Sequence, residues 1–121
     1  TLFGADYATG HGANLAEAPF AAYRDLLVAP ARYDATQTLG AALRLAGIEA
    51  FEYESARAPG GVNVALFEPR ALAGAAPRFQ ETWFCEVVAE AVRFRPARGQ
   101  GVHEFPLARF SADGRLPLPA A

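Results

Sequence analysis

The segment from Tyr33 to Phe67 constrains the fold most, because it carries the signals for a helix, two strands and the turn between them. Asp34 is a good N-cap and Gln37 follows three residues later, which predicts a capping box at the start of a helix. Gly47 tolerates the left-handed conformation that ends many helices, so the helix is expected to end just before it. The spacing i, i+3, i+4, i+7 predicts one buried helical face, made of Leu39, Ala42, Leu43 and Ala46.

Two strands and a tight turn are expected after this helix. Ile48–Tyr53 is short and rich in large apolar residues, which favours a strand, and Val62–Phe67 reads as the returning strand. The sequence Ala58-Pro59-Gly60-Gly61 between them is a strong turn signal. Because its glycines lack the spacing of a dinucleotide-binding or phosphate-binding loop, turn formation is their expected role.

Polar residues gather where the first of these strands ends. Tyr53, Ser55 and Arg57 alternate along the chain, so they share one face if the strand continues that far. Glu52 and Glu54 would share the opposite face, and a solvated surface explains them adequately. A polar cluster of this kind at a strand end suggests a site.

Each residue of the cluster has a functional and a structural interpretation. Arg57 could bind a phosphate or carboxylate through its planar fork, and Tyr53 could stack on a ring or fill the core. Ser55 has no histidine at local spacing and no nucleophile elbow around it, which disfavours a serine hydrolase, and an isolated serine at a strand end often bonds its own backbone. Asn63 could meet the Ser55 face across the turn or make a hydrogen bond at the turn edge.

Composition excludes several classes of function. The 121 residues are 52% hydrophobic and 20% charged, which predicts one globular domain with a substantial core. A net charge of −2 and dispersed arginines disfavour nucleic-acid binding. The single Cys85 excludes an internal disulfide, and with two distant histidines it makes no zinc site of the usual kind, so no metal is expected. Without a spanning apolar run or a signal peptide, we expect a soluble cytoplasmic protein with no membrane partner.

The rest of the chain contains weaker signals. Residues 1–13 and 111–121 are interpreted as loose ends, and no regular element is expected in the first of these segments. Trp83 and Phe84 are expected to be core residues of a strand. The further elements expected are a short helix from Pro19 to Leu27, one helical turn at Glu68–Leu72, a hairpin of Thr82–Val88 and Ala91–Arg95, and an edge strand within Val102–Phe110.

These features together resemble the RES domain, the toxin half of a bacterial toxin–antitoxin pair. The resemblance rests on YDATQTLGAALRLAG from Tyr33, the Y-x-S-x-R pattern around Ser55 and GGVNVALFEPRAL from Gly60, and more weakly on QETWF from Gln80. It implies a compact α+β domain similar to ADP-ribosyltransferases, with mixed strands and a few helices. It also implies an enzyme that takes NAD as substrate, without a further cofactor, and cleaves its nicotinamide–ribose bond by hydrolysis or phosphorolysis.

The resemblance also implies site residues and partners. Ser55 would be catalytic, and the residues predicted to lie around it, Tyr53, Arg57 and Asn63, are expected from their own chemistry to bind the substrate. A helix-turn-helix antitoxin would neutralise the toxin, and a homodimer is left open. The family name records an arginine, a glutamate and a serine, and only the serine has a counterpart here, because matching context is lacking at Glu17, Arg24 and Arg32.

The chain begins with Thr1 and contains no methionine, which indicates the C-terminal portion of a RES domain that is incomplete at its N-terminus. We therefore expect little or no NAD turnover from these residues alone. Two alternatives are carried forward: a catalytically silent RES-like binding module and, less favoured, a mono-ADP-ribosyltransferase that modifies a protein.

Overall fold

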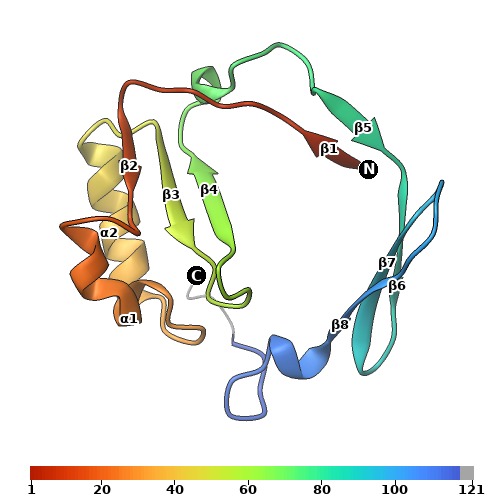
Figure 1. Ribbon diagram of the computed structural model, residues 1–121. Helices are drawn as coiled ribbons and strands as arrows, with labels where there is room; N and C mark the ends of the chain where they lie inside the picture. Colours follow the sequence, from red (N-terminus) through yellow and green to blue (C-terminus); the bar gives the residue numbers. More distant parts are fainter. Residues whose placement is uncertain (118–121) are drawn as a thin grey trace. The chain divides into compact units, whose positions relative to one another are not determined.

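The computed structural model describes residues 1–117, which form two compact units (Figure 1). Unit 1 comprises Thr1–Tyr7 and Leu72–Leu116, and unit 2 comprises Ala8–Ala71 together with Pro117. The mixture of short strands and helices is an α+β architecture, as expected. The elements in chain order are β1 (Leu2–Gly4), β2 (Gly12–Asn14), η1 (Phe20–Tyr23), α1 (Arg24–Leu27), α2 (Asp34–Leu45), β3 (Ala50–Glu54), β4 (Val62–Leu66), η2 (Pro69–Ala71), β5 (Phe79–Glu81), β6 (Trp83–Val87), β7 (Ala91–Pro96), β8 (His103–Pro106) and η3 (Leu107–Arg109).

Unit 2 is built on a three-stranded sheet in the order β2-β3-β4. The central strand β3 pairs antiparallel with β4 from Ala50↔Leu66 to Glu54↔Val62, and it pairs parallel with β2. Figure 1 shows β3 and β4 side by side, joined by the turn that the double glycine predicts. The predicted order of helix, strand, turn and strand is therefore confirmed.

Helix α2 differs from the sequence-based expectation at its start and along its buried face. The backbone N–H of Gln37 donates to the carbonyl of Tyr33 at 2.8 Å, so the first helical hydrogen bond makes Tyr33 the N-cap and leaves Asp34 inside the first turn. Leu43 is buried and Leu39 is half-buried. The other two residues of the expected face, Ala42 and Ala46, are exposed. Only a narrow stripe of the helix contacts the rest of unit 2.

Hydrogen bonds and an ion pair connect the segments where the chain enters and leaves unit 2. The N–H of Ala8 donates to the carbonyl of Ala71 at 2.9 Å. Beside it, the carboxylate of Glu49 accepts a hydrogen bond from the Thr9 hydroxyl at 2.5 Å and pairs with Arg70 at 2.8 Å. One carboxylate thus links three segments that are distant in the sequence.

Unit 1 contains a two-stranded and a three-stranded sheet. Strand β1 pairs antiparallel with β5, and β6, β7 and β8 follow one another in an antiparallel meander. The predicted hairpin and the following edge strand are both present. Across the meander, Arg93 of β7 pairs with Glu86 of β6 at 3.5 Å and with Glu104 of β8 at 2.6 Å, and Glu104 raises the pKa of Arg93 by its hydrogen bond and its charge.

Several expectations for the ends and the core were wrong. Residues 1–13 are not a loose end, since they contain β1 and the start of β2, which are held by partner strands far along the chain. The expected loose end at 111–121 lies partly outside the described residues. Phe84 is 48% exposed, with the guanidinium of Arg95 4.3 Å from its ring centre, and Trp83 is half-buried.

The core is small for a chain of this composition. The described residues that are both apolar and buried are few, and most are alanines or leucines of unit 2: Leu15, Leu43, Ala50, Ala71 and Ala91. Short elements leave much apolar surface uncovered, since each strand has at most six residues. Within the described part of the chain, no helix has the length and apolar character needed to cross a membrane.

Candidate functional site

A cavity of about 480 Å³ lies in unit 2, where α2 and the sheet meet. Its apolar lining comes from the helices, the strands and the segment after β2: Leu15, Leu27, Leu39, Leu43 and Phe51. Its polar lining comes from the N-terminal end of α2, the end of β3 with the turn after it, and the start of β4: Tyr33, Thr36, Tyr53, Glu54, Ser55, Arg57 and Asn63. An apolar pocket with a few convergent polar groups is typical of a small-molecule site.

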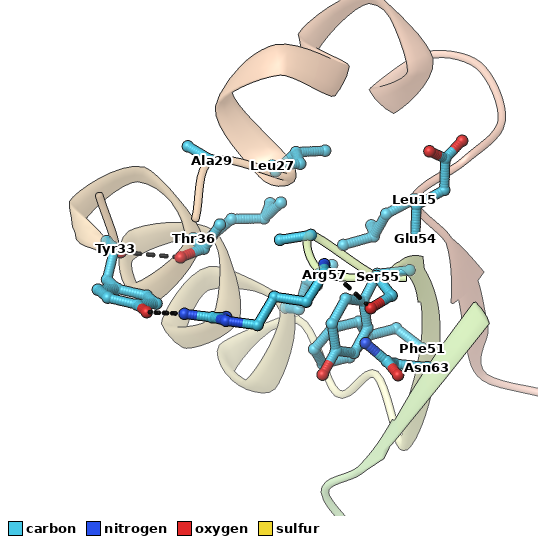
Figure 2. A pocket seen from close by; sticks show the side chains of 15 residues that line it. Leu15, Leu27, Ala29, Tyr33, Thr36, Phe51, Glu54, Ser55, Arg57 and Asn63 are labelled. Atoms are coloured by element: carbon cyan, nitrogen blue, oxygen red, sulfur yellow. Dashed lines mark hydrogen bonds between the residues drawn. The ribbon is translucent and has the colours of Figure 1, made fainter. Parts of the chain in front are cut away.

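All four residues predicted from the sequence line this cavity, namely Tyr53, Ser55, Arg57 and Asn63. Tyr53 and Asn63 are direct partners in the β3–β4 register, so the expected meeting across the turn occurs. Strand β3 ends at Glu54, before Ser55 and Arg57, and the shared face of these two residues arises from the turn rather than from a continued strand. Figure 2 shows Ser55, Arg57 and Asn63 together in the pocket.

Ser55 is held by its own turn. Its N–H donates to the carbonyl of Gly61 at 2.8 Å, which extends the hairpin by one residue beyond β3. Its hydroxyl oxygen accepts hydrogen bonds from the backbone N–H groups of Arg57 at 3.3 Å and Ala58 at 3.1 Å. Ser55 therefore bonds the backbone of its own turn, as the structural interpretation of this serine predicts. Since a hydroxyl also carries one donor, these contacts leave its hydrogen available to a ligand in the cavity.

The double glycine makes this turn geometrically feasible. Gly60 has φ +74°, a left-handed conformation that favours glycine. A side chain at Gly61 would place its Cβ 2.9 Å from the carbonyl oxygen of Ala58, which is backbone and cannot easily move aside. The turn residues that fix Ser55 are thus a conformational requirement, as the sequence predicts.

Arg57 projects from the turn toward the N-terminal end of α2. Its Nη2 donates to the carbonyl of Pro30 at 3.2 Å and to the hydroxyl of Tyr33 at 3.4 Å. The Tyr33 hydroxyl itself donates to the Pro30 carbonyl at 3.1 Å. Figure 2 shows the arginine extended toward the ring of Tyr33, with Ser55 near its backbone. Both acceptors are neutral oxygens, and these two contacts position the guanidinium.

Glu54 corrects the expectation of a solvated acidic face. Its carboxylate lines the cavity and pairs with Arg24 of α1, with Nε of the arginine 2.7 Å from Oε2. The hydrogen bond and charge of Glu54 raise the pKa of Arg24, so the arginine of this pair stays a cation. The pair ties α1 to β3 at the edge of the site.

Sequence reasoning missed Tyr33, Thr36 and Glu54 as lining residues. The helix start was recognised, but the side chains around it were treated only as capping signals. Their position beside the strand end depends on how α2 packs on β3, which no local pattern encodes.

Comparisons with known proteins identify the family. None of the curated proteins matches the chain in sequence. The model of the RES domain matches residues 1–97. This match covers the whole of unit 2 through Ala71 and the strands of unit 1 through β7. The chain therefore belongs to the RES domain family.

Proposed function

We propose that this RES domain binds NAD in the cavity of unit 2 and takes part in cleaving the nicotinamide–ribose bond. One observation carries the proposal: the four site residues predicted from the sequence, Tyr53, Ser55, Arg57 and Asn63, line a single cavity. A volume of about 480 Å³ suits one half of a dinucleotide, since small-molecule sites span roughly 300–1,000 Å³.

The reaction needs charge stabilisation more than a strong nucleophile. The bond between the nicotinamide nitrogen and ribose C1′ breaks, and its electron pair leaves with the neutral nicotinamide. Positive charge then builds on the ribose until the oxygen of water or phosphate bonds to C1′, and water gives up a proton in doing so. A carboxylate near the sugar and a cation near the diphosphate each favour this transition state.

The lining residues suit these tasks in different ways. The Ser55 hydroxyl, fixed by two backbone donors, can donate to a ribose oxygen. The ring of Tyr53, 5.6 Å from that of Phe51, offers an aromatic surface to the nicotinamide. Arg57 can meet the diphosphate, and the Asn63 amide can pair with the carboxamide.

A toxin–antitoxin role is part of the same proposal. Depletion of a central cytoplasmic cofactor would stop growth, and a partner with a helix-turn-helix domain would neutralise the toxin. RES domains are commonly associated with such systems, which supports this assignment.

The test uses the full-length product of the gene that encodes this domain, expressed in a bacterial host, with growth and the cellular NAD pool as readouts. Ser55→Ala should relieve growth inhibition and restore NAD, because the ribose loses its fixed donor. The matched control is Ser111→Ala, since Ser111 lies in unit 1 and its hydroxyl donates to the Leu107 carbonyl. Unchanged toxicity and NAD depletion in the Ser55 variant would contradict the role of this serine.

A catalytically silent binding module is the second candidate, and the Glu54–Arg24 pair favours it. The carboxylate that lines the cavity is already engaged by a cation, which weakens it as a partner for positive charge on the ribose. Incubation of the purified full-length protein with NAD separates the candidates. Binding without nicotinamide release supports the module, and rapid release supports the enzyme. Transfer of label from NAD to protein would instead indicate a mono-ADP-ribosyltransferase.

A further inference from the structure

We propose that Tyr33 is a positioning residue that, together with the Pro30 carbonyl, aims the Arg57 guanidinium at the diphosphate of the bound dinucleotide. This inference rests on the proposed function and deepens it, because it states how the cavity would distinguish a dinucleotide from a nucleoside without phosphate. The evidence is the contact set around Arg57 (Figure 2).

Arg57 is the one cationic side chain among the described residues that line the cavity. The diphosphate is the part of NAD that carries negative charge, and the planar fork of arginine matches phosphate oxygens in a bidentate geometry. A guanidinium has five N–H donors, and the contacts to Pro30 and Tyr33 both use Nη2. These two contacts therefore orient the guanidinium through Nη2.

Tyr33 is suited to hold this group because it is itself fixed. It is the N-cap of α2 and half-buried, and its hydroxyl donates to Pro30 while accepting from Arg57. An arginine side chain that is already oriented loses less conformational freedom when it binds a ligand. Removal of the tyrosine hydroxyl should consequently weaken the binding of ligands that carry phosphate and leave the binding of other ligands unchanged.

The neighbouring acidic group does not oppose this role. Glu54 also lines the cavity, but its pairing with Arg24 offsets its charge. The Glu54 carboxylate therefore repels an approaching diphosphate less than an unpaired carboxylate would.

The experiment compares NAD with nicotinamide riboside, which has the same reactive half and no diphosphate. Isothermal titration of the purified chain should give tighter binding of NAD than of nicotinamide riboside. Tyr33→Phe should weaken NAD binding about 3- to 10-fold, the effect of roughly one long hydrogen bond, and leave the binding of nicotinamide riboside unchanged. Tyr23→Phe is the matched control, because Tyr23 is 59% exposed and does not line the cavity.

A double-mutant cycle tests the link to Arg57. Arg57→Ala should remove the preference for NAD, and adding Tyr33→Phe to it should cause no further loss, because the two residues act through one contact. Equal weakening of both ligands by Tyr33→Phe would indicate a structural role and overturn the inference, as would an unchanged preference for NAD. If the unaltered chain binds neither ligand, the proposed function itself fails, and the inference fails with it.

Discussion

At the scale of single residues, the site depends on a turn whose backbone is more constrained than its side chains. Ser55 is fixed entirely by backbone groups: its N–H is bonded to Gly61, and its hydroxyl accepts from Arg57 and Ala58. The glycines at the far side of the turn are therefore as important for the serine as any residue in the cavity. Changes there should alter the site without touching a ligand.

Gly61→Ala tests this dependence. The added Cβ would lie 2.9 Å from the Ala58 carbonyl oxygen and 3.1 Å from the Ala58 Cβ, so the turn must shift. We expect a loss of about 1–2 kcal/mol in the free energy of unfolding, measured by urea denaturation. We also expect weaker NAD binding, because the shift carries Ser55 with it. Gly10→Ala is the control, since no atom beyond its chain neighbours lies within 4 Å of the place that an added methyl would take. Equal stability of the two variants would show that the turn adapts.

At the scale of elements, α2 is the part of unit 2 that both covers the sheet and bounds the cavity. Leu43 is 7% exposed and lines the cavity, whereas Leu45, two residues later on the same helix, is 90% exposed. The contrast provides a matched pair of substitutions within one helix. It separates the contribution of packing from that of helix propensity.

Leu43→Ala should lower the free energy of unfolding by about 2 kcal/mol, near the lower end of the range for buried leucines, because the side chain already borders a cavity. Leu45→Ala should change it by less than about 0.5 kcal/mol. Thermal or urea unfolding of both variants measures the difference. A similar effect of both substitutions would mean that α2 does not pack on the sheet through Leu43.

Elements with local signals were the ones that the sequence predicted well. The hairpin of β3 and β4 follows from apolar runs and a double-glycine turn, and α2 follows from periodicity and Gly47. Strands β1, β2 and β5 have three residues each and were missed, because β1 and β5 exist only through pairing with each other and β2 through pairing with β3. Their stability comes from contacts that no local pattern encodes.

In the candidate site, too, the residues with local signals were predicted and the long-range contacts were not. Tyr53, Ser55, Arg57 and Asn63 were predicted because they flank one turn and share a face near it. The partners that orient them were not predicted, since Tyr33 is 24 residues from Arg57 and Arg24 is 30 residues from Glu54. These contacts require the packing of α1 and α2 against β3, which is a property of the folded unit.

At the scale of the whole molecule, the chain leaves unit 1 after Tyr7, forms unit 2 and returns to unit 1 at Leu72. The stability of unit 2 depends on holding its entry and exit together. Glu49 does so with Thr9 on one side and Arg70 on the other, and its backbone carbonyl accepts from the N–H groups of Phe67 and Glu68. The hydrogen bond from Thr9, followed by the charge of Arg70, holds the pKa of Glu49 below its ordinary value.

This shift predicts a specific dependence of stability on pH. Because the folded state favours the ionised carboxylate, the unfolded state binds more protons near the ordinary pKa of about 4.3. The stabilisation is therefore fully present above that pH and is lost as the pH falls through the lower pKa of the folded state. Glu49→Gln should lower the Tm at pH 7, and the gap to the unaltered chain should narrow as the pH is lowered from about 4.3 to 3. Glu68→Gln, at an exposed neighbouring carboxylate, controls for the change in net charge. A gap that stays constant over this range would show that Glu49 does not contribute through its ionisation, and a gap that appears equally in the Glu68 variant would assign the effect to net charge.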